Sequence, residues 1–521
     1  MVLQREKPVR IWGWGTPGES VNVRFAGQAV TGQVAADESW SVELSPLETS
    51  FEERSIVVEH AGQSLEVLHV LVGEVWVCGG QSNMEWTLRS SRDADLELTG
   101  ADHGQIRYLR VPKIASPTPE DDFPRKDEGA WRQCVRGQVQ DCTAVGYYFA
   151  VRLSRNLRVP VGLIDISWGG TLAQHWSSAE SLRAIPEMES DIAAFEKRRR
   201  AWTDGGGQAG ADERYQQALA DWEQAQAAAA TAGESKPRKP GKGAFEDPAK
   251  QRQPAGMHNG MLLPIAPATI RGALFYQGEN NSFGTAWKPF HRTFPSVIAD
   301  WRGAFGDPEL PMGLIQIAGW STRRSMTYDM NHHTNIVREI QFTTWRSTPN
   351  TGLIVTYDTN SNGNIHPGHK RPVGERSARW ALAEVYGAPN ASNAQPLEWR
   401  GPIYESTQVT GAKLVVSFEA GTCRGLRLDR DEANGIYVAG ADQVFQHASA
   451  RVLKGDKLEV WCDEVPEPVS VRYGWSNLPS GNLLNGRELP AYPFRSDRWP
   501  LTPHQSEGSY LIDGARAADS K

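Results

Sequence analysis

Hydrophobic and polar residues alternate along the first 70 residues of the chain. Short segments at 9–13, 21–25 and 40–44 carry apolar side chains at about every second position, and Gly and Pro residues separate them. A period of two with frequent turns is typical of half-buried strands that pack as two sheets. The pattern therefore predicts an N-terminal β-sandwich region over residues 1–70.

Between residues 71 and 390 the apolar positions form continuous runs instead. Five such runs lie at 75–78, 161–166, 273–276, 312–317 and 353–357. Continuous runs indicate strands that are covered on both faces, and helical patterns at 144–157 and 374–386 lie between them. Strands that alternate with helices predict a parallel sheet with helices on both sides, so this segment is expected to be an α/β domain.

Two further segments depart from this alternation. Residues 187–254 include an Ala-, Gln- and Glu-rich stretch at 213–231, which predicts an exposed helix, and a Pro- and Lys-rich stretch at 236–242, which predicts a solvated linker. We expect them to form an insertion between two strands of the sheet. Strand patterns return over residues 395–512, either as a separate sandwich or as strands that pack with the N-terminal region.

Composition narrows the class of protein. The chain has 521 residues, with 55 Lys and Arg against 62 Asp and Glu and a net charge of −7. Such a balance, without a long basic run, argues against a nucleic-acid partner or a membrane surface, and no apolar run is long enough to span a membrane. The five cysteines lack the CxxC spacing of a zinc ribbon; Cys134 and Cys142 are close enough to bridge a loop, and the alternative is five thiols.

Residues suited to acyl transfer follow the predicted strands at their carboxyl ends, where open parallel sheets bind ligands. A serine nucleophile needs a base, which is usually histidine, and its tetrahedral intermediate needs hydrogen-bond donors from backbone N–H groups or side-chain amides. The chain lacks the G-x-S-x-G turn of α/β-hydrolases, because residue 84 is Met. In chain order the candidates are Ser82, Gly170, Gln277, Asn281, Asp358 and His366.

Several segments resemble signatures of the sialate O-acetylesterase family, within the SGNH-hydrolase superfamily. The matching blocks run from residues 1–5 to 471–475 and include GQSNMEW at 80–86, SWGGT at 167–171, YQGENN at 276–281 and the His-Pro segment at 366–376. The resemblance implies an α/β fold with a flavodoxin-like three-layer α/β/α SGNH-hydrolase domain and N- and C-terminal β-sandwich regions. It also implies an O-acetylesterase without metal or cofactor, whose partner is an acetylated carbohydrate, either a sialic acid or a polysaccharide.

The resemblance also assigns roles to individual residues. Ser82 matches the nucleophile and His366 the general base. The backbone N–H groups of Ser82 and Gly170, together with the side-chain amide of Gln277, are expected to form the oxyanion hole, and Asn281 could share the role of the amide. Apart from the resemblance, the positions of Trp168 and Trp320 beside the strand ends predict rings that stack on sugar, and Glu279 is expected to position the substrate; the alternatives are core packing for the rings and a buried ion pair for Glu279.

One position departs from the family pattern. Members usually have Asp two residues before the catalytic His, where this chain has Asn364. An acidic partner orients the imidazole and stabilises its cation. Three hypotheses follow: Asp358 acts as the acid; Asn364 or a backbone carbonyl orients His366 in a Ser–His dyad; or the site is degenerate and the protein binds carbohydrate with weak esterase activity.

Two expectations concern metals and location. The adjacent His332 and His333 supply too few ligands for a metal site. The chain opens without an apolar leader, which indicates either a cytoplasmic protein or a leader that is absent from this chain. Because family members are usually exported, the resemblance favours a secreted or periplasmic protein. The sequence does not indicate an oligomeric state.

Overall fold

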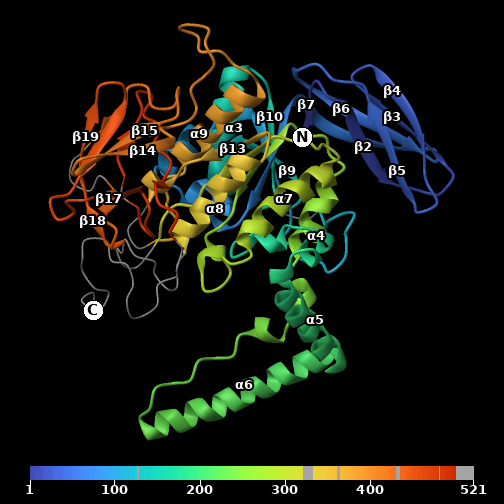
Figure 1. The fold of residues 1–521 in the computed structure, drawn as a ribbon. Helices are drawn as coiled ribbons and strands as arrows, with labels where there is room; N and C mark the ends of the chain where they lie inside the picture. The colour runs from blue at the N-terminus through green and yellow to red at the C-terminus, as the bar shows by residue number, and fades with distance from the viewer. Residues whose placement is uncertain (126–127, 321–332, 361–363, 430–434, 480, 500–521) are drawn as a thin grey trace.

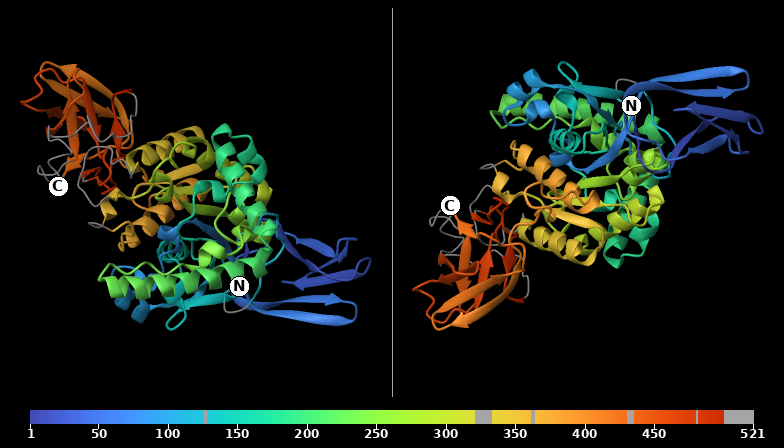
Figure 2. Two further views of the ribbon diagram at one scale, coloured as in Figure 1. Left: turned by 90° about the horizontal axis from the view of Figure 1, so that it is seen from below. Right: turned by 90° about the horizontal axis from the view of Figure 1, so that it is seen from above.

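The computed structural model describes residues 1–125, 128–320, 333–360, 364–429, 435–479 and 481–499. A central α/β unit separates two β-rich regions, which lie at opposite ends of the molecule (Figures 1 and 2). The sequence left two arrangements open for the C-terminal strands, a separate region or packing with the N-terminal strands. The structure has them as a separate region. A helical arm projects away from the central unit.

The central sheet has the strand order β13-β12-β11-β7-β10-β8-β9. Neighbouring strands are parallel except β8 and β9. The five apolar runs correspond to β7, β10, β11, β12 and β13, so the predicted α/β class is confirmed. The strand bounds are β7 (Gln63–Gly80), β8 (Asp102–Arg110), β9 (Trp131–Val135), β10 (Val161–Asp165), β11 (Gly272–Tyr276), β12 (Met312–Ile315) and β13 (Thr351–Ile354).

Helices cover both faces of this sheet. On one face, Trp76 of β7 packs edge-on against Phe149 and Trp380, which lie on two neighbouring helices. On the other face, Trp301 contacts Phe275 of β11 at a ring-centroid distance of 5.2 Å. The first pair of helices is α3 (Ala144–Leu157) and α9 (Arg371–Trp380), and the second is α7 (Phe290–Phe305) and α8 (Thr334–Ser347).

The order of the strands places a crevice at the end of β7. After β7 the chain adds β8 and β10 on one side of it, and then crosses to add β11, β12 and β13 on the other side. In open parallel sheets, ligands bind beyond the carboxyl ends of the strands at the point where the order reverses. The loops after β7, β10 and β11 therefore meet where chemistry is expected.

The N-terminal region continues β7 into a second domain, so the predicted boundary at residue 70 falls inside one strand. The first half of β7 pairs with β1 (Val2–Gln4) and β6 (Ser50–His60), and β6 leads to β3 (Ser20–Phe25) and β4 (Gln28–Gln33). A separate pair forms from β2 (Val9–Trp14) and β5 (Ser39–Leu44). Buried residues of both layers, such as Val23 and Trp40, make a hydrophobic core distinct from that of the central unit.

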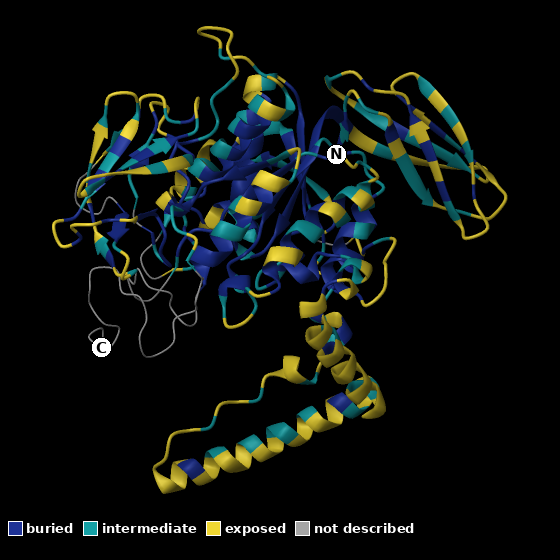
Figure 3. Cartoon of the chain, viewed as in Figure 1, coloured by how far each residue is buried: buried dark blue, intermediate teal, exposed yellow. Residues whose placement is uncertain are grey.

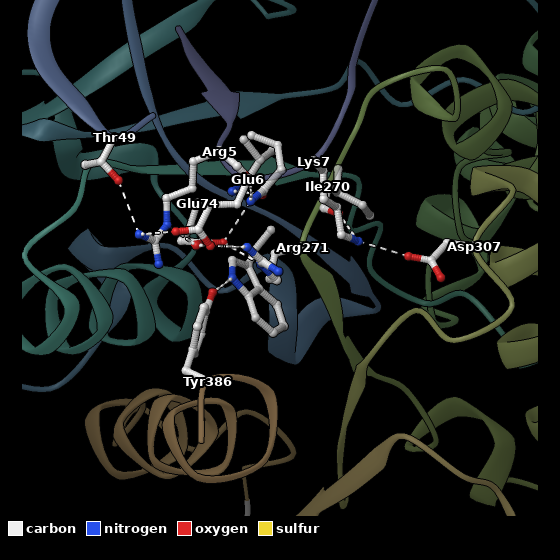
Figure 4. Close-up of polar contacts among 12 residues, drawn as sticks. Arg5, Glu6, Lys7, Thr49, Glu74, Ile270, Arg271, Asp307 and Tyr386 are labelled. Carbon is white, nitrogen blue, oxygen red and sulfur yellow. Dashed lines mark hydrogen bonds and ion pairs between the residues drawn. The ribbon is translucent and has the colours of Figure 1, made fainter. Parts of the chain in front are cut away.

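Buried charges hold the N-terminal region to the central sheet (Figure 4). The carboxylate of Glu74, which is fully buried, accepts hydrogen bonds from Arg5 at 2.5 Å and Arg271 at 2.8 Å. Lys7 adds an ion pair with Asp307 at 3.0 Å. Burial raises the pKa of Glu74, but hydrogen bonds and positive charge from Arg271 and Arg5 outweigh this effect and hold the pKa below its ordinary value.

The insertion between β10 and β11 forms the projecting arm. It contains α4 (Ala179–Arg183), α5 (Glu189–Asp204) and α6 (Gly207–Ala232). The predicted exposed helix at 213–231 lies inside α6, whose only buried residues are Ala211 and Ala229. Figure 3 shows that most of this helix is exposed.

The C-terminal region contains two four-stranded sheets and packs on the central unit beside α8. Tyr473 shares a hydrogen bond of 2.8 Å with Tyr357, and Arg495 pairs with Glu339 of α8 at 3.0 Å. One sheet contains β14 (Tyr404–Thr410), β15 (Lys413–Phe418), β19 (Ser449–Leu453) and β20 (Lys457–Trp461). The other contains β17 (Ile436–Ala439), β18 (Phe445–His447), β21 (Ser470–Tyr473) and β23 (Phe494–Arg495), and a short pair joins β16 (Arg427–Leu428) to β22 (Leu483–Leu484).

Two sequence expectations concern features outside these layers. All five cysteines are free thiols, so Cys134 and Cys142 form no disulfide here. Within the described ranges, no helix is both long and apolar enough to cross a membrane.

Candidate active site

A sharp turn at the end of β7 presents Ser82 at the crevice. Gly80 has a φ of +123°, and a Cβ atom there would lie 2.1 Å from the carbonyl oxygen of Tyr276. Only glycine fits this backbone conformation without strain. Ser82 then begins the short helix α1 (Ser82–Glu85), and its side chain is partly exposed.

His366 lies against this serine. Its Nε2 atom is 2.8 Å from Oγ of Ser82, which is the distance that a base needs to accept a proton from a hydroxyl. The imidazole also stacks on the indole of Trp86, with ring centroids 5.2 Å apart and an angle of 21° between the planes. The structure therefore brings together the two residues that the sequence predicted as nucleophile and base.

The candidates for the third residue contact other groups. Asp358 forms two hydrogen bonds with Arg376, at 2.7 and 2.5 Å. Asn364 accepts a hydrogen bond from the backbone N–H of His366 at 2.9 Å, so it holds the loop of the histidine rather than its ring. Among the described residues, none is hydrogen-bonded to Nδ1 of His366.

A buried polar network lies beneath the histidine loop. The Asn83 amide donates to Glu279 at 2.6 Å and to the carbonyl oxygen of Ile365 at 3.0 Å, and its oxygen accepts from Lys370. Asn83, Glu279 and Lys370 are almost wholly buried. Burial raises the pKa of Glu279 and lowers the pKa of Lys370, each to about 7.

This network changes the interpretation of Glu279, which the sequence placed among the substrate-binding residues. Its carboxylate is buried and accepts a hydrogen bond from Asn83, so it holds Asn83 in place and does not face the substrate side. Asn83, which the sequence analysis did not single out, joins the helix of Ser82 to the residue before His366. The signal was present, because Asn83 and Lys370 stand inside the matching blocks at 80–86 and 366–376.

The electrostatic surroundings favour neutral His366. Burial lowers the pKa of its imidazole, and the positive charge of Lys370 lowers it further, while Glu85 opposes both effects. A neutral imidazole is the form that can accept the serine proton.

Two backbone N–H groups are available to a developing oxyanion. Glu85 accepts the N–H of Gly169 at 2.6 Å, which leaves Gly170 as the donor from this loop, as the sequence favoured. Gly170 has a φ of +73°. Over the described part of the chain, the N–H groups of Ser82 and Gly170 have no hydrogen-bond acceptor.

The amides of Gln277 and Asn281 are engaged elsewhere. Nitrogen Nε2 of Gln277 donates to the carbonyl oxygen of Thr171 at 2.8 Å, to Gln81 at 2.7 Å and to Asn281 at 3.2 Å. The amide of Asn281 donates to Gln174 at 3.2 Å. The sequence prediction of side-chain amides in the oxyanion hole does not match these bonds, which instead fasten the loops after β7, β10 and β11 to one another.

The two aromatic candidates, Trp168 and Trp320, lie on the loops that follow β10 and β12. Trp168 donates its backbone N–H to Gly80 at 2.9 Å, and its ring is partly buried against the central core. Trp320 contacts Phe283 at a ring-centroid distance of 5.7 Å. Within the described ranges, no three His, Cys, Asp or Glu residues are grouped as metal ligands. His332 lies outside those ranges.

Comparisons with known proteins found relatives that share most of the length of this chain. No family model matches the chain. Human sialate O-acetylesterase is 28% identical over 444 residues, which are 79% of this chain and 73% of that protein, and the mouse sialate O-acetylesterase is 28% identical over 453 residues. The crystal structure of a carbohydrate acetylesterase from Xanthomonas citri is 30% identical, with a TM-score of 0.76, and the match covers 96% of this chain and 97% of that one.

Proposed function

Because this chain belongs to the sialate O-acetylesterase family, we propose that it removes O-acetyl groups from carbohydrate through an acetyl–Ser82 intermediate. The observation that carries the proposal is the 2.8 Å contact between Ser82 Oγ and His366 Nε2 at the reversal point of the sheet. Membership of this family makes the chain a carbohydrate O-acetylesterase. The contact between Ser82 and His366 supports a serine nucleophile that is activated by a histidine base.

In the proposed first step, His366 takes the proton of Ser82 as the hydroxyl attacks the acetyl carbonyl carbon. The N–H groups of Ser82 and Gly170 stabilise the resulting oxyanion. The sugar oxygen then leaves with the proton from His366, and the acetyl group remains on Ser82. In the second step His366 activates a water molecule, which releases acetate and restores the serine.

We propose that packing and the backbone, rather than a carboxylate, hold the imidazole. Trp86 stacks on its face, Asn364 fixes its backbone N–H, and Asn83 fixes the preceding carbonyl group. This arrangement corresponds to the Ser–His dyad among the three hypotheses from the sequence.

The alternative function is a carbohydrate-binding protein with a degenerate site. It would follow if the dyad hydrolyses the ester too slowly for catalysis. Export of the protein stays a prediction.

The test is acetate release from acetylated sialic acid and acetylated polysaccharides, measured for the wild type beside Ser82→Ala. The wild type is expected to release acetate, and Ser82→Ala is expected to lose about three orders of magnitude in kcat or more. A folded Ser82→Ala enzyme that keeps more than about a tenth of the activity would overturn the role of Ser82. Absence of turnover in the wild type, with retained binding of the same glycans, would favour the alternative function.

A further inference from the structure

The peptide between Gly169 and Gly170 carries one of the two backbone donors of the proposed oxyanion hole. Glycine has no Cβ atom, so a peptide that is flanked by two glycines has more than one sterically allowed orientation. The N–H of Gly170 faces an oxyanion in only one of them. Contacts from outside this loop, which follows β10, are therefore needed to fix the orientation of the peptide.

Side chains from three other segments hold the backbone of the two glycines. Glu85 of α1 accepts the N–H of Gly169 at 2.6 Å, and Asn280 donates to the carbonyl oxygen of Gly170 at 2.9 Å. Arg252, which follows the helices of the insertion, donates from Nη1 to the carbonyl oxygen of Gly169 at 2.8 Å. Of these three contacts, the one from Arg252 acts on the same peptide that contains the N–H of Gly170.

This contact fixes the direction of the Gly170 N–H. In a trans peptide the C=O and N–H bonds point in opposite directions within a rigid plane. A guanidinium that binds the oxygen on one side therefore directs the N–H to the other side. Arg252 fills the space of a side chain at residue 170, because a Cβ atom there would lie 2.1 Å from its Nη1. A Cβ atom on Gly169 would lie 3.2 Å from Cβ of Ser82, so the loop lies between the arginine and the nucleophile.

The positive charge of Arg252 acts on the same peptide. A charged donor makes a stronger hydrogen bond than a neutral one, and such a bond polarises the peptide so that its N–H becomes a better donor. Over the described part of the chain, Arg252 forms no ion pair with an Asp or Glu residue. The carboxylate of Glu85, on the other side of Gly169, is paired with Lys113. The charge of Arg252 is therefore available to strengthen the donor.

We propose that Arg252 is a positioning residue of the oxyanion hole. It holds the Gly169–Gly170 peptide in the orientation that presents the Gly170 N–H to the acetyl oxygen, and its charge strengthens that donor. The proposal rests on the proposed function and adds a residue that acts through the peptide. It also gives the segment after the helical insertion a part in the reaction.

Hydrolysis of p-nitrophenyl acetate by three variants tests the proposal. Arg252→Gln is expected to lower kcat and kcat/KM alike, by about tenfold or more, because the oxyanion exists only in the transition state. Loss of a whole donor costs about a hundredfold or more, and the effect of Arg252 is smaller because it is exposed and acts through the donor. Arg252→Lys keeps the charge and should return kcat to within about threefold of the wild type. Lys250→Gln removes an exposed charge two residues away and should match the wild type.

The pH profile separates this role from an effect on the base. The charges that act on the imidazole of His366 are those of Lys370 and Glu85, so the midpoint of kcat/KM should be the same in Arg252→Gln and the wild type. Wild-type rate constants in folded Arg252→Gln, or an equal loss in Lys250→Gln, would overturn the proposal. A moved midpoint, or no recovery in Arg252→Lys, would also overturn it.

Failure of the proposed function gives a different set of results. If Ser82→Ala keeps its activity, or the wild type releases no acetate, the proposed function fails. Crystal structures of the wild type and Arg252→Gln then decide the inference without turnover: a rotated Gly169–Gly170 peptide in the variant supports it, and the same orientation in both overturns it. Acetate release that requires Ser82, with wild-type rate constants in Arg252→Gln, leaves the proposed function standing and rejects the inference.

Discussion

Two opposite charges act on the imidazole of His366: the Lys370 ammonium disfavours its protonation and the Glu85 carboxylate favours it. Burial and Lys370 lower the pKa of the imidazole. Because only neutral imidazole accepts the serine proton, activity should rise with pH through a midpoint below the ordinary histidine value of about 6.5. A profile of kcat/KM against pH measures this midpoint, and a value above 6.5 would contradict the electrostatic account.

The variant Lys370→Met tests whether the charge of Lys370 lowers the pKa of His366. Removal of a positive charge favours imidazolium, so the midpoint should move upward relative to the wild type. Lys413→Met, which removes a distant ammonium that pairs with Glu459, serves as the control and should leave the midpoint in place. If Lys370→Met does not fold, Lys370→Met/Glu279→Gln removes the buried pair together. An unmoved midpoint in a folded variant would show that Lys370 does not act on His366.

At the residue scale, the sequence could predict chemistry but not which hydrogen bonds each side chain makes. Ser82 and His366 follow from residue type and position after predicted strands. Gln277 and Asn281 have the right chemistry for an oxyanion hole, yet Gln81, Thr171 and Gln174, which bond to them, come from loops far away in the chain. Whether an amide faces the substrate or a neighbouring loop depends on that packing, which the local pattern does not contain.

At the scale of elements, the turn between β7 and α1 has the strictest steric requirement. Gly80→Ala would place a methyl group 2.1 Å from the Tyr276 carbonyl oxygen, at a positive φ. Backbone strain of this kind is worth about 1–3 kcal/mol, before the clash is counted. The variant should therefore unfold at lower temperature and lose most esterase activity, as thermal unfolding and p-nitrophenyl acetate hydrolysis would show.

Gly100→Ala is the matched control, because its added methyl group meets no atom within 4 Å at the end of α2 (Ala94–Gly100). It should behave as the wild type in both measurements. A Gly80→Ala enzyme with wild-type stability and activity would mean that the turn is not as tight as described.

Element prediction succeeded where the pattern was continuous. The five buried strands and the helix at 144–157 were found because their residues face a core throughout. β8 was missed because its first half carries polar residues and only its second half is buried. The insertion lies between β10 and β11, and its projection from the central unit could not be predicted from helices whose exposed faces carry no periodic signal.

At the scale of the whole molecule, the junction in Figure 4 holds the N-terminal region on the sheet. Glu74→Ala would leave Arg5 and Arg271 without their buried counter-ion, which destabilises by about 3–5 kcal/mol in comparable pairs. Glu66→Ala, on the exposed half of the same strand, is the control. Denaturant unfolding at neutral pH measures both, and equal stabilities of the two variants would contradict the account.

The pH dependence of that stability has a defined sign. The pKa of Glu74 is lowered on folding, so its contribution is full above the unfolded value of about 4.3 and is lost as pH falls through the lower folded pKa. The stability difference between wild type and Glu74→Ala should therefore shrink in acid. A difference that does not change with pH would mean that the Glu74 charge contributes nothing.

The arrangement of the three regions could not be predicted from local patterns. The sequence left open whether the C-terminal strands pack with the N-terminal ones. The answer depends on side-chain pairs such as Tyr357 with Tyr473 and Glu339 with Arg495, which link residues more than a hundred positions apart. The family resemblance identified the sequence blocks that form the site and their order along the chain. It did not predict these contacts between regions.

The central claim is that an acetyl group passes through Ser82. The most direct measurement is mass spectrometry of peptides from enzyme that is quenched in acid during turnover of p-nitrophenyl acetate. The account predicts an added acetyl group on the peptide containing Ser82, which is absent when unreacted enzyme is quenched in the same way. Continued turnover by Ser82→Ala, or an acetyl group that forms only on another residue, would contradict it.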